Sequence, residues 1–286
     1  MRPLRPRDVI VSRIVTAEVL AQPKNQEQVT DWLMEDPGGV DRRRAETVTA
    51  ATADSLHRAV LYLVVGDMLD LVGHAADTLP EHTFHQTDPP TDNGLCFLAT
   101  PVTAPIRRGA AGSDHSDLVA FSWFKFEDQD DTGVMVMWWS QEADGPALLP
   151  ALNYAAYEGE HWIKAQHGSA EGQPELAAWN ATFWRMVQEP YVDVEQRVPK
   201  AARRAARGDV PPDPVRVVTL RRREPAEAAD AGGAVDWSHR WWVNGYWRQQ
   251  WYPSQGRHSP RYVLGHVKGP ADKPFVPKET VRVLRR

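Results

Sequence analysis

The amino-terminal part of the chain carries apolar residues at helical spacing. Two amphipathic stretches, residues 14–20 and 26–34, come first, and a longer helical pattern follows over residues 42–79. No proline interrupts this longer pattern, so we expect one helix there, broken or kinked near Gly66. Its apolar face consists of Val48, Leu56, Val60, Leu63 and Val64.

The middle of the chain changes from helical to strand-like spacing. Short apolar runs at residues 94–100, 118–126 and 134–139 are typical of strands. The acidic, glycine-containing segment 127–133 indicates a hairpin between the last two runs, so we expect a small antiparallel sheet. Residues 146–190 then return to the pattern of a helix.

Four further patterns of strand type follow in the last third, at residues 215–220, 238–252, 261–267 and 280–284. They predict a compact, strongly twisted sheet or a small barrel of four or five strands. Residues 197–207 precede them and can form a basic helix.

Together these patterns predict an α+β fold in two domains. A helical body with a small antiparallel sheet would occupy residues 1–196, and a β-rich module with a leading basic helix would occupy residues 197–286. Charge supports the division: residues 197–286 hold 19 Lys and Arg against 8 Asp and Glu, and residues 1–196 hold 14 against 30. Such a split indicates either an acidic partner for the basic part or mutual docking of the two parts.

Composition narrows the class of protein. The 42% of hydrophobic and 25% of charged residues are those of a globular protein. No apolar run reaches the roughly 20 residues that span a bilayer, and the basic start lacks the apolar region of a signal peptide. The single cysteine, Cys96, forms no internal disulfide, and its apolar neighbours predict a buried, inert thiol. We therefore expect a cytoplasmic protein.

Motifs for cofactors and metals are missing from the sequence. It contains no phosphate-binding loop, no dinucleotide-binding glycine pattern and no Gly-x-Ser-x-Gly nucleophile elbow. Residues 82–85, 114–117 and 158–161 combine His with Asp, Glu or a second His, but none has the spacing of a zinc motif. We expect these to be solvated loop residues, and we expect no cofactor and no metal.

The densest chemistry lies between Trp237 and Trp251, where five of the twelve tryptophans fall. Asn244-Gly245 is the favoured pair of a two-residue hairpin turn; alternatively, Gly245 marks a bulge in one long strand. The aromatic rings would either fill the core of a small domain or stack on nucleic-acid bases. The two uses can coexist on opposite faces of a sheet.

Basic residues accompany these rings and would neutralise phosphates. On the expected basic helix, one face carries Lys200, Arg203, Arg204 and Arg207. Our leading hypothesis is binding of RNA or single-stranded DNA, since no helix-turn-helix or zinc finger is evident. The candidate nucleic-acid-binding residues are Arg203, Arg204, Arg207, Arg240, Trp242, Tyr246, Arg248, Arg257 and Lys268.

Two other functions stay open. His239, Arg257 and His258 could form a metal-free nuclease or toxin-like centre, in which the histidines act as acid and base. The arginine would then stabilise the charge that develops on phosphorus. In the third hypothesis, the protein is a phage or host interaction protein without chemistry, and its acidic and basic parts dock together.

The carboxy-terminal segment also resembles a protein family from actinobacteria and their phages and plasmids. The similarity lies in four runs: Val215-Arg-Val-Val-Thr-Leu-Arg-Arg, His239-Arg-Trp, Gly245-Tyr-Trp-Arg-Gln-Gln-Trp-Tyr-Pro-Ser and Lys268-Gly-Pro. It covers residues 180–286 and, more loosely, the part before them. The resemblance implies an actinobacterial or mobile-element setting, and it brings no activity or site residue with it.

Overall fold

The computed structural model of the 286-residue chain describes residues 4–35, 41–107, 113–127, 131–141, 145–160, 174–200, 213–221 and 238–277. The chain forms two compact units, Met1–Leu220 and Arg221–Arg286. We call the first unit the body. The units separate after Leu220 and not at residue 197, because residues 215–220 form a strand that pairs inside the body.

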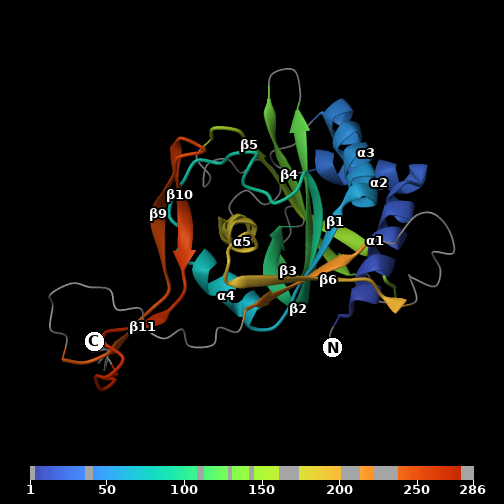
Figure 1. Cartoon of the computed structure of the whole chain (residues 1–286). Coiled ribbons are helices and arrows are strands. Elements are labelled where there is room, and N and C mark those ends of the chain that lie inside the picture. Colours follow the sequence, from blue (N-terminus) through green and yellow to red (C-terminus); the bar gives the residue numbers. More distant parts are fainter. Residues whose placement is uncertain are drawn as a thin grey trace, which may run out of the picture. The chain divides into compact units, whose positions relative to one another are not determined.

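A seven-stranded mixed sheet forms the centre of the body. Its strands are β1 (Val60–Val64), β2 (Asn93–Arg107), β3 (Ser113–Glu127), β4 (Thr132–Gln141), β5 (Leu148–Tyr157), β6 (Val192–Arg197) and β7 (Val215–Leu220). They lie in the order β5-β4-β3-β2-β1-β7-β6 (Figure 1). β1 is parallel to β2 and to β7, and the other pairings are antiparallel. β2 to β5 thus form a meander of consecutive strands.

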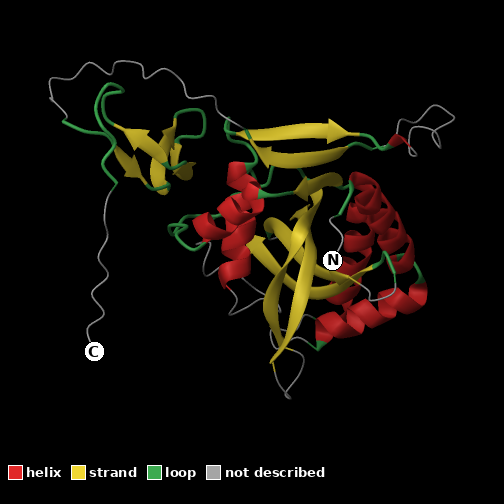
Figure 2. Ribbon diagram, turned by 90° about the horizontal axis from the view of Figure 1, so that it is seen from below, coloured by secondary structure: helices red, strands yellow, loops and turns green. Residues whose placement is uncertain are grey.

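Helices cover both faces of this sheet. They are α1 (Pro6–Leu20), α2 (Pro23–Met34), α3 (Arg42–Arg58), α4 (Asp67–Ala76) and α5 (Pro174–Met186). α1, α2 and α3 pack together on one face, and α4 and α5 lie together on the other (Figures 1 and 2). The body therefore has three layers. In the part of the chain that the structure describes, no helix is long and apolar enough to cross a membrane.

The expected α+β fold with a small antiparallel sheet is wrong, and one cause lies within residues 42–79. α3 ends at Arg58, Val60–Val64 is strand β1, and α4 starts at Asp67. β1 lies between two parallel neighbours and is covered on both faces, so nearly every residue in it is apolar. A short, fully apolar run fits the helical period as well as it fits a buried strand.

The second cause lies within residues 146–190. The segment Leu148–Tyr157, which we expected to be helical, is strand β5 at the edge of the sheet. Pro150 lies inside it. Proline breaks a helix interior but is tolerated at a sheet edge, where one side of the strand needs no ladder partner. Where the structure describes residues 146–190, the segment that keeps the expected helical conformation is Pro174–Met186, the helix α5.

Several local predictions are confirmed. The amphipathic stretches at residues 14–20 and 26–34 lie in α1 and α2. β3 and β4 form the expected hairpin, with Phe126 opposite Gly133. Cys96 is fully buried, and this burial raises the pKa of its thiol well above the ordinary value, as expected for an inert cysteine.

A dense aromatic cluster fills the space between the sheet and α5. Phe121 and Trp138 of the sheet contact each other, with ring centroids 5.0 Å apart, and Phe183 of α5 lies edge-on to Phe121 at 5.5 Å. Asn180 of α5 is fully buried beside these rings. Its Oδ1 accepts hydrogen bonds from Trp138 Nε1 (3.0 Å) and from the Tyr154 hydroxyl (2.8 Å). One amide therefore satisfies two buried donors of the sheet.

Replacing Asn180 by leucine should destabilise the body by about 3 kcal/mol, because both donors lose their buried acceptor. Urea unfolding of the full-length chain measures this cost. The control repeats Asn180→Leu in a Trp138→Phe, Tyr154→Phe background, where no donor is left unpaired and the added cost should be about 1 kcal/mol or less. Equal costs in the two backgrounds would show that the hydrogen bonds contribute nothing.

Candidate functional site

The second unit contains a long two-stranded ribbon. Its strands are β8 (Trp241–Val243), β9 (Tyr246–Tyr252), β10 (Arg257–Val263) and β11 (His266–Lys268). β9 pairs with β10, and β8 pairs with β11, both antiparallel (Figure 1). The register is the same in the two halves, since Tyr246 lies opposite Val263 and Val243 lies opposite His266. The four strands are therefore one hairpin with a short interruption in each arm.

The turn of this hairpin is at Pro253–Gly256 and not at Asn244-Gly245. Gln255 N donates to the Tyr252 carbonyl at 3.0 Å, and Gly256 has a φ of 62°, which favours glycine. The expected two-residue turn is thus wrong. Gly245 instead interrupts one long strand, which is the alternative that the sequence left open.

Each interruption contains a glycine that is covered by an aromatic ring. A Cβ atom on Gly245 would lie 2.2 Å from the Tyr262 hydroxyl oxygen, and one on Gly265 would lie 2.6 Å from the Trp242 ring. Rings therefore occupy the space where side chains would stand. This packing keeps the two arms together where the ladder is interrupted.

The start of the ribbon is tied to the segment after it. The Arg240 backbone donates to the Pro274 carbonyl and accepts from Val276 N, both at 2.8 Å. The Arg240 side chain adds a bond from Nε to the Lys273 carbonyl, also 2.8 Å. Arg240, a candidate phosphate ligand, thus also has a structural role.

The two faces of the ribbon differ in character. Residues that pair directly share a face, and faces alternate along each strand. One face carries Trp247 edge-on to Tyr262, with centroids 5.2 Å apart, and Trp251 5.0 Å from His258. We call the opposite face the arginine–aromatic face. Its members are Trp242, Tyr246, Arg248, Gln250, Tyr252, Arg257, Ser259, Arg261, Val263 and Val267.

Two rings of the arginine–aromatic face are open to solvent. Trp242 is 48% exposed and Tyr246 is 44% exposed. They are four residues apart on one arm, roughly 13 Å along an extended strand. Trp251 on the opposite face is 46% exposed as well, so the arginine–aromatic face is distinguished by the arginines that accompany its exposed rings.

The same face concentrates positive charge. Residues 238–277 contain six Lys and Arg against one Asp, and three of the six, Arg248, Arg257 and Arg261, lie on this face. Arg248 lies directly opposite Arg261 in the ladder. Arg257 is half-buried; burial lowers the pKa of its guanidinium, and its Nε donates to Gln255 Oε1 at 3.0 Å.

The ribbon brings together some of the candidate residues and not others. Trp242, Tyr246, Arg248 and Arg257 share the arginine–aromatic face. Lys268 lies opposite Trp241, on the other face. Arg261 was not among the candidates predicted from the sequence, because only the strand register shows that it lies opposite Arg248.

The structure describes little of the expected basic helix. Arg203, Arg204 and Arg207 lie outside the described residues. Arg197, where this helix was expected to start, is the last residue of β6, and its Nη2 lies 2.6 Å from Glu195 Oε2. The segment 280–284, which we expected to be a strand, also lies outside the described residues.

The proposed acid–base trio is not assembled on the ribbon. Arg257 and His258 are neighbours on β10, so their side chains leave on opposite faces. His258 lies on β10 opposite Trp251, near the turn. His239 precedes β8, at the far end of the other arm, and contacts Trp241. The structure therefore gives no support to a catalytic centre made of these three residues.

Two of the residues considered as metal ligands, His85 and Glu158, are partners of each other, and residues 114–117 lie in strand β3 and not in the expected loop. His85 Nδ1 lies 2.7 Å from Glu158 Oε1, and Glu158 Oε2 accepts from Gln86 N at 2.6 Å. Among the residues that the structure describes, no group of three or more His, Cys, Asp or Glu could hold a metal ion.

The glycine at position 245 provides a test of this ribbon. Gly245→Ala should make the amides of β9 exchange roughly thirtyfold faster, because the new methyl group collides with Tyr262 and costs about 2 kcal/mol. Hydrogen exchange with mass spectrometry on the full-length chain measures this effect. Tyr262→Phe, which removes the nearest atom, should relieve part of it, and Gly73→Ala, with open space around it, should leave exchange of β9 unchanged. Unchanged exchange of β9 in Gly245→Ala would contradict the described packing.

Comparison with known proteins assigns no family to this chain. No protein-family model matches it, and no curated protein matches it. Among solved structures, the crystal structure of AcrVA2 is similar over 90% of this chain and 95% of that chain, with 9% sequence identity and a TM-score of 0.43. A similarity this low supports no inference about the function of this chain.

Proposed function

We propose that this protein binds single-stranded nucleic acid through the arginine–aromatic face of its ribbon. The observation that carries the proposal is that exposed rings and arginines share one face. Trp242 and Tyr246 are open for stacking, and the Arg248–Arg261 pair follows them along the same face. Rings that stack on bases and cations that follow the backbone are the two components of non-specific single-strand binding.

The exposed rings favour a single strand over a duplex. Bases inside a duplex are stacked on each other, so an aromatic side chain can stack only on a base that is unpaired. The ring of Trp242 lies over Gly265, which holds it in place. A ring held in place in this way loses little further conformational entropy when a base stacks on it.

The arginines supply the attraction to phosphate. Arg248 and Arg261 stand opposite each other, so one phosphate can contact both guanidinium groups. This term is not specific for sequence and weakens with salt, because binding releases the counterions of the nucleic acid. The actinobacterial or mobile-element setting implied by the sequence resemblance is part of the same proposal.

Salt dependence gives the first test. The full-length chain should bind fluorescein-labelled oligouridine more tightly than a duplex of equal length, as measured by fluorescence anisotropy. If about three phosphates are contacted, the logarithm of the binding constant should fall with the logarithm of salt concentration with a slope of about −2. No binding at low salt, or binding that is indifferent to salt, would contradict the proposal.

Single substitutions separate stacking from charge. Tyr246→Ala should weaken binding of oligouridine about 5- to 150-fold without changing the salt slope, and Tyr246→Phe, which keeps the ring, should restore most of the affinity. Arg248→Ala should make the slope less negative by about 0.7. Arg43→Ala, an exposed arginine of α3, is the matched control and should change neither quantity. Equal effects of the Arg43 and Arg248 substitutions would show that the arginine–aromatic face is not the nucleic-acid-binding surface, which would contradict the proposal.

A further inference from the structure

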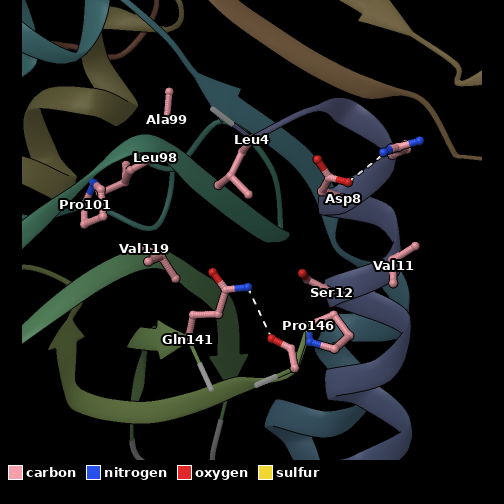
Figure 3. Close-up of a pocket in the computed structure, with 12 residues that line it drawn as sticks. Leu4, Asp8, Val11, Ser12, Leu98, Ala99, Pro101, Val119, Gln141 and Pro146 are labelled. Atoms are coloured by element: carbon pink, nitrogen blue, oxygen red, sulfur yellow. Dashed lines mark hydrogen bonds and ion pairs between the residues drawn. The ribbon is translucent and has the colours of Figure 1, made fainter. Parts of the chain in front are cut away.

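A cavity lies in the body between α1 and the sheet. Its volume is about 440 Å³, which is within the range of small-molecule sites. Leu4 and Val11 border it from the α1 side, and Leu98, Pro101 and Val119 border it from β2 and β3 (Figure 3). The walls are mostly aliphatic. Nothing in the proposed binding by the ribbon uses this space.

Irregularities in the sheet account for the cavity. The β2–β3 ladder shifts register between Phe97 and Val102, and the β3–β4 ladder shifts between Leu118 and Ala120. Bulges bend strands and increase their twist locally. Ala99, Pro101 and Val119, which border the cavity, lie within these shifts. The cavity is thus a consequence of strand geometry and not of one missing side chain.

Two polar groups face into this aliphatic space. Ser12 of α1 is only 3% exposed and lines the cavity, so its hydroxyl is available to a molecule that enters this space. Gln141 of β4 donates from Nε2 to the Gly145 carbonyl at 3.3 Å, which leaves Oε1 as an acceptor. Figure 3 shows both side chains directed into the same space from opposite walls. A hydroxyl that lines a cavity can form a hydrogen bond with a ligand or a water molecule that enters it.

The charges at the rim compensate each other. Arg7 Nε lies 3.3 Å from Asp8 Oδ1, and Asp8 Oδ2 accepts from Arg5 N at 2.9 Å. No uncompensated charge therefore faces the cavity from the residues that line it. A charged ligand would lose its hydration there without gaining a partner ion, whereas a neutral ligand would not.

From this geometry we propose that the cavity is a binding site for a neutral, mainly aliphatic small molecule that carries an amide group. The Ser12 hydroxyl donates to the amide carbonyl, and Gln141 Oε1 accepts from the amide N–H. The aliphatic part contacts Leu98, Pro101 and Val119. This site is independent of the ribbon.

A matched pair of probes tests the site. Cyclohexanecarboxamide and cyclohexanecarboxylate have nearly the same shape, but only the first is neutral near pH 7. Titration of the full-length chain, followed by NMR, should show the carboxamide binding at least tenfold more tightly, with the shifted resonances in α1 and β2. Equal affinity for the two probes, no binding of the carboxamide, or shifts confined to other elements would each overturn the proposal.

Two substitutions add a structural control. Ala99→Phe fills the cavity and should abolish binding, and Ser12→Ala should weaken carboxamide binding roughly five- to tenfold by removing one donor. Ser55→Ala is the matched control, since it removes a buried helix hydroxyl that donates to the Thr52 carbonyl in α3. Circular dichroism checks that each variant folds. If the Ala99→Phe variant does not fold, the affinity of the Ser12→Ala variant for the carboxamide tests the proposal. Unchanged affinity in Ser12→Ala, or an equal loss in Ser55→Ala, would overturn the proposal.

Discussion

The body depends on the burial of both faces of β1. Leu61 and Leu63 of this strand lie in the core that α1, α2 and α3 cover, and Tyr62 contacts Phe183 of α5 on the opposite face, with ring centroids 5.8 Å apart. Parallel pairing with β2 and β7 requires long connections, so β7 comes from residues far along the chain. This pairing explains why the body extends to Leu220 although the charge of the sequence changes sign near Arg197.

The ribbon is subject to a different constraint. Two strands alone are marginally stable, and they provide no second layer of their own for large side chains. The unit compensates with rings over Gly245 and Gly265 and with the bonds of Arg240 to the segment that follows the ribbon. The arginine–aromatic face still leaves Trp242 and Tyr246 half exposed. In the described part of this unit, the feature that makes the ribbon a candidate interface therefore follows from its two-stranded form.

Local patterns of the sequence were sufficient for some elements. Alternation and an acidic turn predicted the β3–β4 hairpin, and helical periodicity predicted α1, α2 and α3. The same periodicity failed at β1, because a short apolar run fits a buried strand and a helix equally well. It failed again at β5, where Pro150 was a signal for an edge strand and against a helix.

The candidate site was predicted in part for a similar reason. Composition pointed to the Trp- and Arg-rich segment, and alternation could sort residues within one strand. Which residues face each other depends on the register, and the position of the turn at Pro253–Gly256 sets that register. The Arg248–Arg261 pair and the coverage of Gly245 by Tyr262 follow from pairing between distant residues, so no local pattern could reveal them.

The central claim is that the arginine–aromatic face contacts unpaired bases. Photo-crosslinking of the full-length chain to oligouridine that contains 4-thiouridine, followed by mass spectrometry of the crosslinked peptides, tests it most directly. We expect crosslinks at Trp242 and Tyr246 that disappear at high salt. Crosslinks confined to the helices of the body, or none at low salt, would contradict it.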